Sequence, residues 1–351
     1  MGRRVRHQST RVVLRPLRTN IGGMSFVQPV GALGIAEGNE ESLHAENGFG
    51  ASKMEIRSTV CQICQWGTGS LHLVREMMLG TQDKFCFLEC SECGCLSLAE
   101  VPADLEKYYP QDYCSFMIRP SSLLRRLRNA LYLSPFSFMV NWKQRDDFEV
   151  IRRVKLKKNM RFLEVGGRSG SPLNDLRDLG YDARGVNSFV QTDIVDQFGV
   201  RVERKTLADV KGKFDVILFR HSLEHMPIDV LRMAREHMKS GGYCVVCIPV
   251  LGWAWQNYAT DWAEIDAPRH LFVHTPKSFS MLAEKSDFRI DKIVFDTSEL
   301  QLWANEFYRR GIPLTKVPPP TRKQRNRMRE FAEGLNLSGN GDTAQFYLRP
   351  S

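Results

Sequence analysis

The chain has 351 residues, 42% hydrophobic and 10% aromatic, which is enough for a core in one large or two modest domains. It has no apolar run long enough to span a bilayer and no apolar stretch typical of a signal peptide, so we expect no membrane span. The sequence thus predicts a cytoplasmic protein with nine reduced or metal-bound cysteines, and its net charge of +9 would indicate nucleic acid only if clustered on one face.

Residues 1–53 are predicted to form a disordered basic extension. Arginine supplies every charged side chain among the first twenty residues, and a glycine-rich stretch follows. An acid-free, arginine-rich start is also typical of a mitochondrial transit peptide. We favour a disordered tail, or translation that begins at Met54, over a targeting signal.

Residues 54–115 are predicted to form a zinc-ribbon-like module. Two Cys-x-x-Cys pairs, Cys61 with Cys64 and Cys90 with Cys93, can bring four thiolates to one ion. Four thiolates leave no position open for water, so the expected zinc is structural. The alternative is that these cysteines are simply buried or form disulfides.

Residues 116–158 are predicted to form a helical connector, because leucines recur between arginines in this stretch. Pro135 is expected to divide it into two helices. Three tyrosines just before this connector, Tyr108, Tyr109 and Tyr113, either pack the cysteine module against the next domain or cover a substrate cleft. We favour packing.

Residues 159–351 alternate strand-like and helix-like segments, which predicts an α/β fold. Residues 162–165 form a predicted buried strand, and a glycine-rich turn follows with Gly166, Gly167 and Gly170. Glycine lets the backbone of such a turn approach a cofactor closely, because a Cβ there would collide. Glu164, just before the turn, suits an amine better than a phosphate.

Further segments extend the alternation. We expect a helix at 229–240 that ends at Gly241-Gly242. The other expected strands and helices are a helix at 172–179, strands at 183–186, 216–219 and 243–249, a helix at 276–285, a strand at 289–295, a basic helix at 322–329 and a strand at 345–348. The basic helix could bind RNA, but a solvated charged face explains it more simply.

The order of these motifs resembles the class I S-adenosylmethionine-dependent methyltransferases over most of residues 56–348. The glycine turn, the phrase Phe214-Asp-Val-Ile217, the segment His221-Ser-Leu-Glu224-His225 and residues 266–275 carry the resemblance. It implies a Rossmann-like sheet with helices on both faces. The sequence also resembles a group of methyltransferases that often carry an amino-terminal Cys-x-x-Cys ribbon. Several members of this group act in polysaccharide or secondary-metabolite pathways.

The resemblance implies a binding site for S-adenosylmethionine. The residues that would line it are Glu164, Gly166, Gly167, Gly170, Asn187, Ser188, Leu207, Asp209 and Arg220. Two positions depart from the family pattern. Asn187 stands where an acid usually holds both ribose hydroxyls, and Arg168 stands where a glycine is usual. We also expect Gly166→Val to abolish cofactor binding without unfolding the protein.

His225, His270 and His221 are the candidate catalytic residues, because an oxygen acceptor needs a base that titrates near neutrality. Alternatively, Glu224 caps the next helix and His225 packs at the sheet edge. The pattern His-x-x-Glu-His also occurs in one class of zinc metalloproteases, but there both histidines lie on a helix. Here the segment directly follows a strand, which disfavours metal binding.

Four aromatic residues follow the predicted strand 243–249, and they could stack on an acceptor or pack in the core: Trp253, Trp255, Tyr258 and Trp262. The leading interpretation is methyl transfer from S-adenosylmethionine to a small molecule or saccharide, at oxygen. The alternatives are a sugar C-methyltransferase and a non-catalytic binding protein with a methyltransferase-like fold, which Arg168 and Asn187 would favour.

Overall fold

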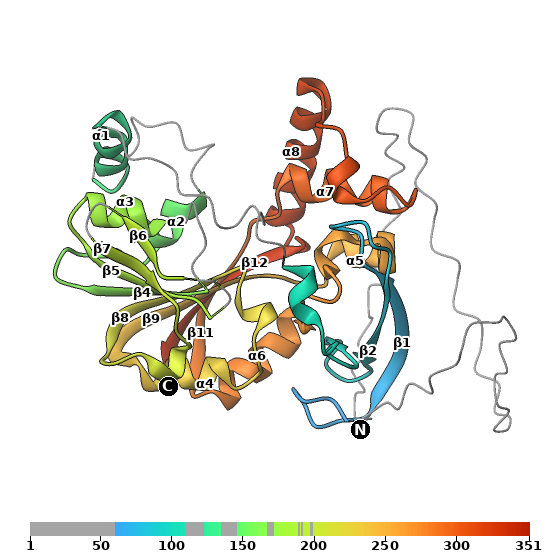
Figure 1. The fold of residues 1–351 in the computed structure, drawn as a ribbon, viewed down its shortest axis with the longest axis horizontal. Helices are drawn as coiled ribbons and strands as arrows, with labels where there is room; N and C mark the ends of the chain where they lie inside the picture. Colours follow the sequence, from blue (N-terminus) through green and yellow to red (C-terminus); the bar gives the residue numbers. More distant parts are fainter. Residues whose placement is uncertain are drawn as a thin grey trace, which may run out of the picture. The chain divides into compact units, whose positions relative to one another are not determined.

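The computed structural model describes residues 60–109, 123–134, 146–166, 172–188, 190, 192–196 and 199–351. The chain divides after Ser52, and residues 53–351 form one compact unit. The predicted extension over 1–53, with the possible start at Met54, therefore lies outside the described residues, as do Pro135 and Tyr113. The fold below is that of the described part of the second unit (Figure 1).

The larger sheet has eight strands in the order β11-β12-β9-β8-β4-β5-β7-β6. Its five central strands, from β9 to β7, are parallel, and β6, β12 and β11 each run antiparallel to a neighbour. The strands are β4 (Arg161–Val165), β5 (Asp182–Val186), β6 (Ile194–Asp196), β7 (Gly199–Glu203), β8 (Phe214–Arg220), β9 (Met238–Pro249), β11 (Phe288–Phe295) and β12 (Thr343–Pro350).

Continuous apolar stretches form the central strands because both faces of the sheet are buried. In β8, Ile217 and Phe219 point into one core cluster, and Val216 and Leu218 point into another. In β4, Leu163 belongs to the first cluster and Phe162 to the second, as the two-residue period of a strand requires.

Helices cover both faces, as predicted (Figure 1). One face carries α1 (Leu123–Tyr132), α2 (Asp146–Arg153) and α3 (Pro172–Asp178), and the other carries α4 (Val230–Glu236) and α6 (Pro276–Lys285). A further group consists of α5 (Trp253–Tyr258), α7 (Glu299–Tyr308) and α8 (Arg322–Leu337). None of the helices in the described ranges is both long and apolar enough to cross a bilayer.

The cysteine segment, residues 60–109, supplies three strands of a smaller sheet. The strand order in this sheet is β1-β2-β3-β10. Its strands are β1 (Thr68–Arg75), β2 (Lys84–Cys90), β3 (Leu96–Leu98) and β10 (Phe272–Val273). β10 comes from the chain that follows β9 and pairs antiparallel with β3. The cysteine segment is therefore joined to the α/β part through backbone hydrogen bonds, while the predicted boundaries near residues 115 and 158 stay predictions.

The α/β prediction is confirmed, but one helix end is wrong. Helix α4 ends at Glu236, and Gly241 and Gly242 lie within β9. A Cβ on Gly242 would come within 2.7 Å of the Asp215 carbonyl oxygen, so this glycine permits a close approach of β9 to β8. The pair therefore marks strand packing and not the end of a helix.

Candidate functional site

A first cavity of about 390 Å³ opens at the carboxyl ends of β4 and β5, which is where ligands bind in open parallel sheets. Polar and apolar side chains both line it, so it offers hydrogen bonds and an apolar surface. Its lining residues are Val165, Gly166, Val186, Asn187, Ser188, Lys205, Thr206, Leu207, Ala208, His225, Met226, Pro227, Asp229, Val230 and Met233.

Gly166 is required by the local backbone. Its φ of +74° lies in the left-handed region, and a Cβ there would come within 2.4 Å of the Ser222 Cβ. The Ser222 hydroxyl donates a hydrogen bond to the Val165 carbonyl, which holds the chain after β8 against the turn. The expectation that Gly166→Val spares the fold is therefore wrong, because the side chain would clash inside the protein.

Three of the other predicted cofactor residues line the first cavity: Asn187, Ser188 and Leu207. Glu164, Asp209 and Arg220 are not among its lining residues. The exposed Asp209 accepts hydrogen bonds from the backbone N–H and hydroxyl of Thr206, so it caps a short turn. Gly167, Arg168 and Gly170 lie outside the described residues.

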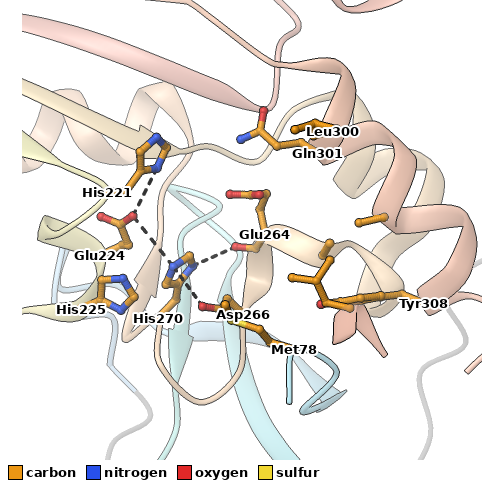
Figure 2. Close-up of a pocket in the computed structure, with 13 residues that line it drawn as sticks. Met78, His221, Glu224, His225, Glu264, Asp266, His270, Leu300, Gln301 and Tyr308 are labelled. Carbon is orange, nitrogen blue, oxygen red and sulfur yellow. Dashed lines mark hydrogen bonds and ion pairs between the residues drawn. The ribbon is translucent and has the colours of Figure 1, made fainter. Parts of the chain in front are cut away.

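A second cavity of about 350 Å³ lies beyond the end of β8 (Figure 2). It brings all three candidate histidines together with acidic residues, and its other walls come from α7 and from residues 263–270. The lining residues are Met78, His221, Glu224, His225, Ala263, Glu264, Asp266, His270, Leu300, Gln301, Ala304, Tyr308 and Leu314. His225 lines both cavities and so marks the place where they approach each other.

Hydrogen bonds to backbone carbonyls orient both buried histidines. The Nδ1 of His225 lies 2.9 Å from the Arg269 carbonyl oxygen, and the Nδ1 of His270 lies 2.9 Å from the Glu264 carbonyl oxygen. A carbonyl only accepts, so each Nδ1 carries a hydrogen that it donates. In the neutral rings the lone pair is then on Nε2. The Tyr109 hydroxyl also lies 3.2 Å from the Nδ1 of His225, whereas Tyr108 is buried in the cysteine segment.

Glu224 and His221 complete this group of polar residues. Glu224 and His225 lie on a short turn, Leu223–His225, directly after β8. The Glu224 side chain is only 2% exposed, and its Oε1 lies 3.8 Å from the Nδ1 of His221 and 3.9 Å from the Nε2 of His270. His221 has a φ of +45°, which is uncommon for a residue with a side chain and often marks a functional site.

Arg269 fixes the segment that carries His270. It is fully buried, and its guanidinium donates to the Tyr108 carbonyl, to Glu76 and to Asp266. Burial alone would raise the pKa of Asp266, but the charge of Arg269 lowers it to about 2. Asp266 is therefore ionised at neutral pH. No local pattern in the sequence predicted that Arg269, Glu76 and Asp266 would come together.

The aromatic residues after β9 pack in the protein interior. Trp262 is buried in a cluster with Val74 and Phe87, so it joins the cysteine segment to the chain after β9. Tyr258 is also buried, and the Trp253 ring packs 4.9 Å from that of Phe331. Neither described cavity is lined by any of the four residues, which favours the packing alternative.

The four predicted cysteine ligands lie together. The Sγ atoms of Cys61, Cys64, Cys90 and Cys93 are all within 4.8 Å of one another. The Cys61–Cys93 and Cys64–Cys90 sulfur distances are 3.7 and 3.4 Å. A disulfide requires about 2.05 Å, whereas a tetrahedral ion with bonds of about 2.3 Å separates sulfurs by about 3.8 Å.

The backbone around Cys90 favours its thiolate form. Burial would raise the pKa of Cys90, but backbone N–H groups, including that of Cys93, lower it to about 7. Thiolates are the form that binds metal. Burial raises the pKa of Cys61 and of Cys93, so these two thiols would lose their protons as a metal binds. Cys86 and Cys95 are not part of the four-cysteine group, and burial raises the pKa of each.

Part of the chain matches a known protein family. Residues 142–293 match a family described as a methyltransferase domain, and this range contains the glycine turn and most of both cavities. The prediction of a methyltransferase enzyme that depends on S-adenosylmethionine is thereby confirmed. No curated protein matches the chain.

Several solved methyltransferases are similar in structure. One from Archaeoglobus fulgidus is described as dependent on S-adenosylmethionine, is 18% identical, and has a TM-score of 0.38 over 61% of this chain and 96% of its own. A geranyl diphosphate C-methyltransferase from Streptomyces coelicolor is 11% identical, with a TM-score of 0.43 over 72% of this chain and 100% of its own. A possible histamine N-methyltransferase from Thermotoga maritima is 15% identical, with a TM-score of 0.38 over 65% and 96%. Similarities at this level say nothing about the acceptor.

Proposed function

We propose that the protein transfers a methyl group from S-adenosylmethionine to an oxygen atom of a small-molecule or saccharide acceptor. The observation that supports this most directly is that His225 lines both cavities. Methyl transfer is an in-line displacement at a sulfonium, so the acceptor and the donor must meet end to end. Two cavities that share one wall fit this requirement.

The first cavity would hold S-adenosylmethionine, which supplies the electrophilic methyl group. Gly166 would let the backbone approach the ligand, and the buried amide of Asn187 can hydrogen-bond a ribose hydroxyl without adding a charge. Leu207, Val230 and Met233 supply an apolar surface for the base. Gly167 and Gly170, which lie outside the described residues, stay in the proposed set, together with Glu164, Asp209 and Arg220.

The second cavity would hold the acceptor. Its polar lining, which includes Glu264, Gln301 and Tyr308, suits a ligand that carries hydroxyl groups. His225, His270 and His221 face this cavity, and a neutral imidazole nitrogen can take the proton of a hydroxyl as the oxygen attacks. We therefore assign activation of the acceptor to these histidines.

The four-cysteine group would hold a structural zinc ion. The sulfur distances and the backbone N–H groups around Cys90 fit a tetrahedral tetrathiolate site. Its part in the function is indirect, because the same small sheet contains β10, which follows His270 closely in the chain.

Calorimetric titration with S-adenosylhomocysteine tests the cofactor site. Ala208 is exposed and lines the first cavity, so Ala208→Trp should fill the cavity without disturbing the core. We expect the wild type and the control Ala208→Ser to bind, and Ala208→Trp to bind at least tenfold more weakly. Absence of binding by the wild type at millimolar ligand would contradict the proposal.

Incubation with labelled S-adenosylmethionine and pooled hydroxylated metabolites then tests the acceptor class. Label should appear in a product that is stable to base, as expected for an ether. Label found only in amines or thioethers would contradict transfer to oxygen.

A further inference from the structure

Glu224, His225 and His270 bring three potential metal ligands together in the wall of the second cavity (Figure 2). One ligand atom from each residue lies within 4.8 Å of the others. The two segments that carry them are joined by a 2.7 Å hydrogen bond from the Leu271 N–H to the Glu224 carbonyl. This hydrogen bond fixes the relative position of the two backbone segments that carry the three side chains.

The orientation of the histidines fits metal binding. A histidine that binds a metal usually donates its other ring N–H to a backbone carbonyl or a carboxylate, which fixes the tautomer. His225 and His270 both do so, through Nδ1, to the carbonyls of Arg269 and Glu264. Each neutral ring thus keeps the Nε2 lone pair that a cation requires.

The distances in the cluster fit a cation between the groups. The Nε2 of His270 and the Nδ1 of His221 lie 3.9 and 3.8 Å from the Oε1 of Glu224, which is too long for a hydrogen bond. Two metal–ligand bonds of about 2.1 Å each span up to about 4.2 Å. A cation can therefore reach these atoms with small movements of the side chains.

The electrostatics of the cavity also favour a cation. Glu224, Glu264 and Asp266 all line it; Asp266 is already paired with Arg269, whereas the Glu224 side chain, only 2% exposed, lies beside His221 and His270. Burying a carboxylate is costly, and a bound cation offsets this cost. The helical zinc motif that the sequence disfavours would use both His221 and His225, whereas here His225 stays in the cluster and His270, from a distant segment, takes the place of His221.

We propose that Glu224, His225 and His270 bind a divalent first-row transition-metal ion in the second cavity, with His221 at its edge. Two imidazoles and one carboxylate favour Mn²⁺, Co²⁺ or Zn²⁺ over Mg²⁺ and Ca²⁺, which prefer oxygen ligands. Because all three residues line the second cavity, water or an oxygen of the acceptor in that cavity would complete the coordination of the ion.

The role of this ion rests on the proposed function, but its binding does not. A hydroxyl bound to a divalent cation loses its proton to solvent more readily than a free hydroxyl. In the metal-bound protein, His225 and His270 would therefore activate the acceptor through the ion that they hold, and not by taking the proton directly. The preferred acceptor would carry a hydroxyl next to a second oxygen that can also bind the ion.

The test measures Mn²⁺ binding to protein whose cysteine site already contains zinc. Free Mn²⁺ is followed by electron paramagnetic resonance, and the variants are Glu224→Gln and His270→Ala. The matched control is His237→Ala, which removes a histidine of the same domain that lines neither described cavity. We expect one Mn²⁺ per chain in the wild type and the control, and at least tenfold weaker binding in both cluster variants.

Two results would overturn the proposal: no Mn²⁺ or Co²⁺ binding by the wild type at millimolar metal, or equal binding by all variants. If a variant does not fold, pulsed electron paramagnetic resonance of Mn²⁺ bound to the wild type replaces that measurement. We expect a hyperfine coupling between the Mn²⁺ electron spin and imidazole nitrogen, and its absence would contradict the assignment of the ligands. Titration with S-adenosylhomocysteine in the same samples reports the cofactor site separately, so a failure of the metal proposal can be told from a failure of the methyltransferase proposal.

Discussion

Substitution of Arg269 by methionine should destabilise the protein strongly, because it leaves the buried carboxylate of Glu76 and the mostly buried carboxylate of Asp266 without their cation. Arg269 and Glu76 are both fully buried, and the guanidinium nitrogen lies 3.3 Å from the Glu76 carboxylate. Removal of one partner from such a pair typically costs 3–5 kcal/mol. Glu76 keeps three backbone donors, the N–H groups of Leu79, Gly80 and Thr81. We therefore expect the free energy of unfolding to fall by about 3 kcal/mol, at the lower end of this range.

Urea unfolding, followed by tryptophan fluorescence, measures this loss as a change in the free energy of unfolding. Trp262 is buried close to the cysteine segment and provides the signal. The matched control is Arg289→Met, which breaks an exposed pair with Asp291 and should change stability by less than about 0.5 kcal/mol. A loss below about 1 kcal/mol for Arg269→Met would refute the assignment of Arg269 as the buried link between the two segments.

Three further predictions address the cysteine site, a buried carboxyl group and the glycine turn. Cys61→Ser should lower both the bound zinc, measured by metal analysis, and the stability, whereas Cys86→Ser outside the four-cysteine group should not lower the zinc content. Burial raises the pKa of the Asp342 carboxyl group to about 7, although a backbone N–H partly offsets this shift. The contribution of this group to stability is therefore fully present below the pKa of the unfolded state, near 4, and is lost as the pH rises through 7. Urea midpoints at pH 5 and pH 8 should therefore differ in the wild type and differ less in Asp342→Asn. Gly166→Ala should cost about 1–3 kcal/mol in thermal or urea unfolding, because of its positive φ and the clash with Ser222, and an unchanged midpoint would contradict this.

Periodicity and turn chemistry predicted the central sheet well, because a strand that is buried on both faces must be continuously apolar. The strands around Phe162 and Val216 and the glycine turn at Gly166 follow from such local signals. The pair Gly241-Gly242 misled the prediction, since a glycine that permits close strand packing has the same sequence signal as one that ends a helix.

The candidate site was predictable one residue at a time but not as an arrangement. Motif position selected His225 and His270 separately, but no local pattern shows that Glu224 lies between His221 and His270. No motif in the sequence marks the cavity wall from α7, which includes Tyr308. Such groupings depend on contacts between distant segments, which leave no periodic signal in the chain.

Residues 263–275 connect the cysteine segment to the second cavity through several independent contacts. β10 pairs with β3, the Thr275 hydroxyl donates to the Cys93 carbonyl, and Arg269 binds Glu76, while His270 in the same stretch faces the cavity. The first cavity is lined by none of the described residues of the cysteine segment. Loss of zinc should therefore disturb the acceptor side and leave binding of S-adenosylhomocysteine in place. On this argument the cysteine segment supports the wall of the second cavity that carries His270.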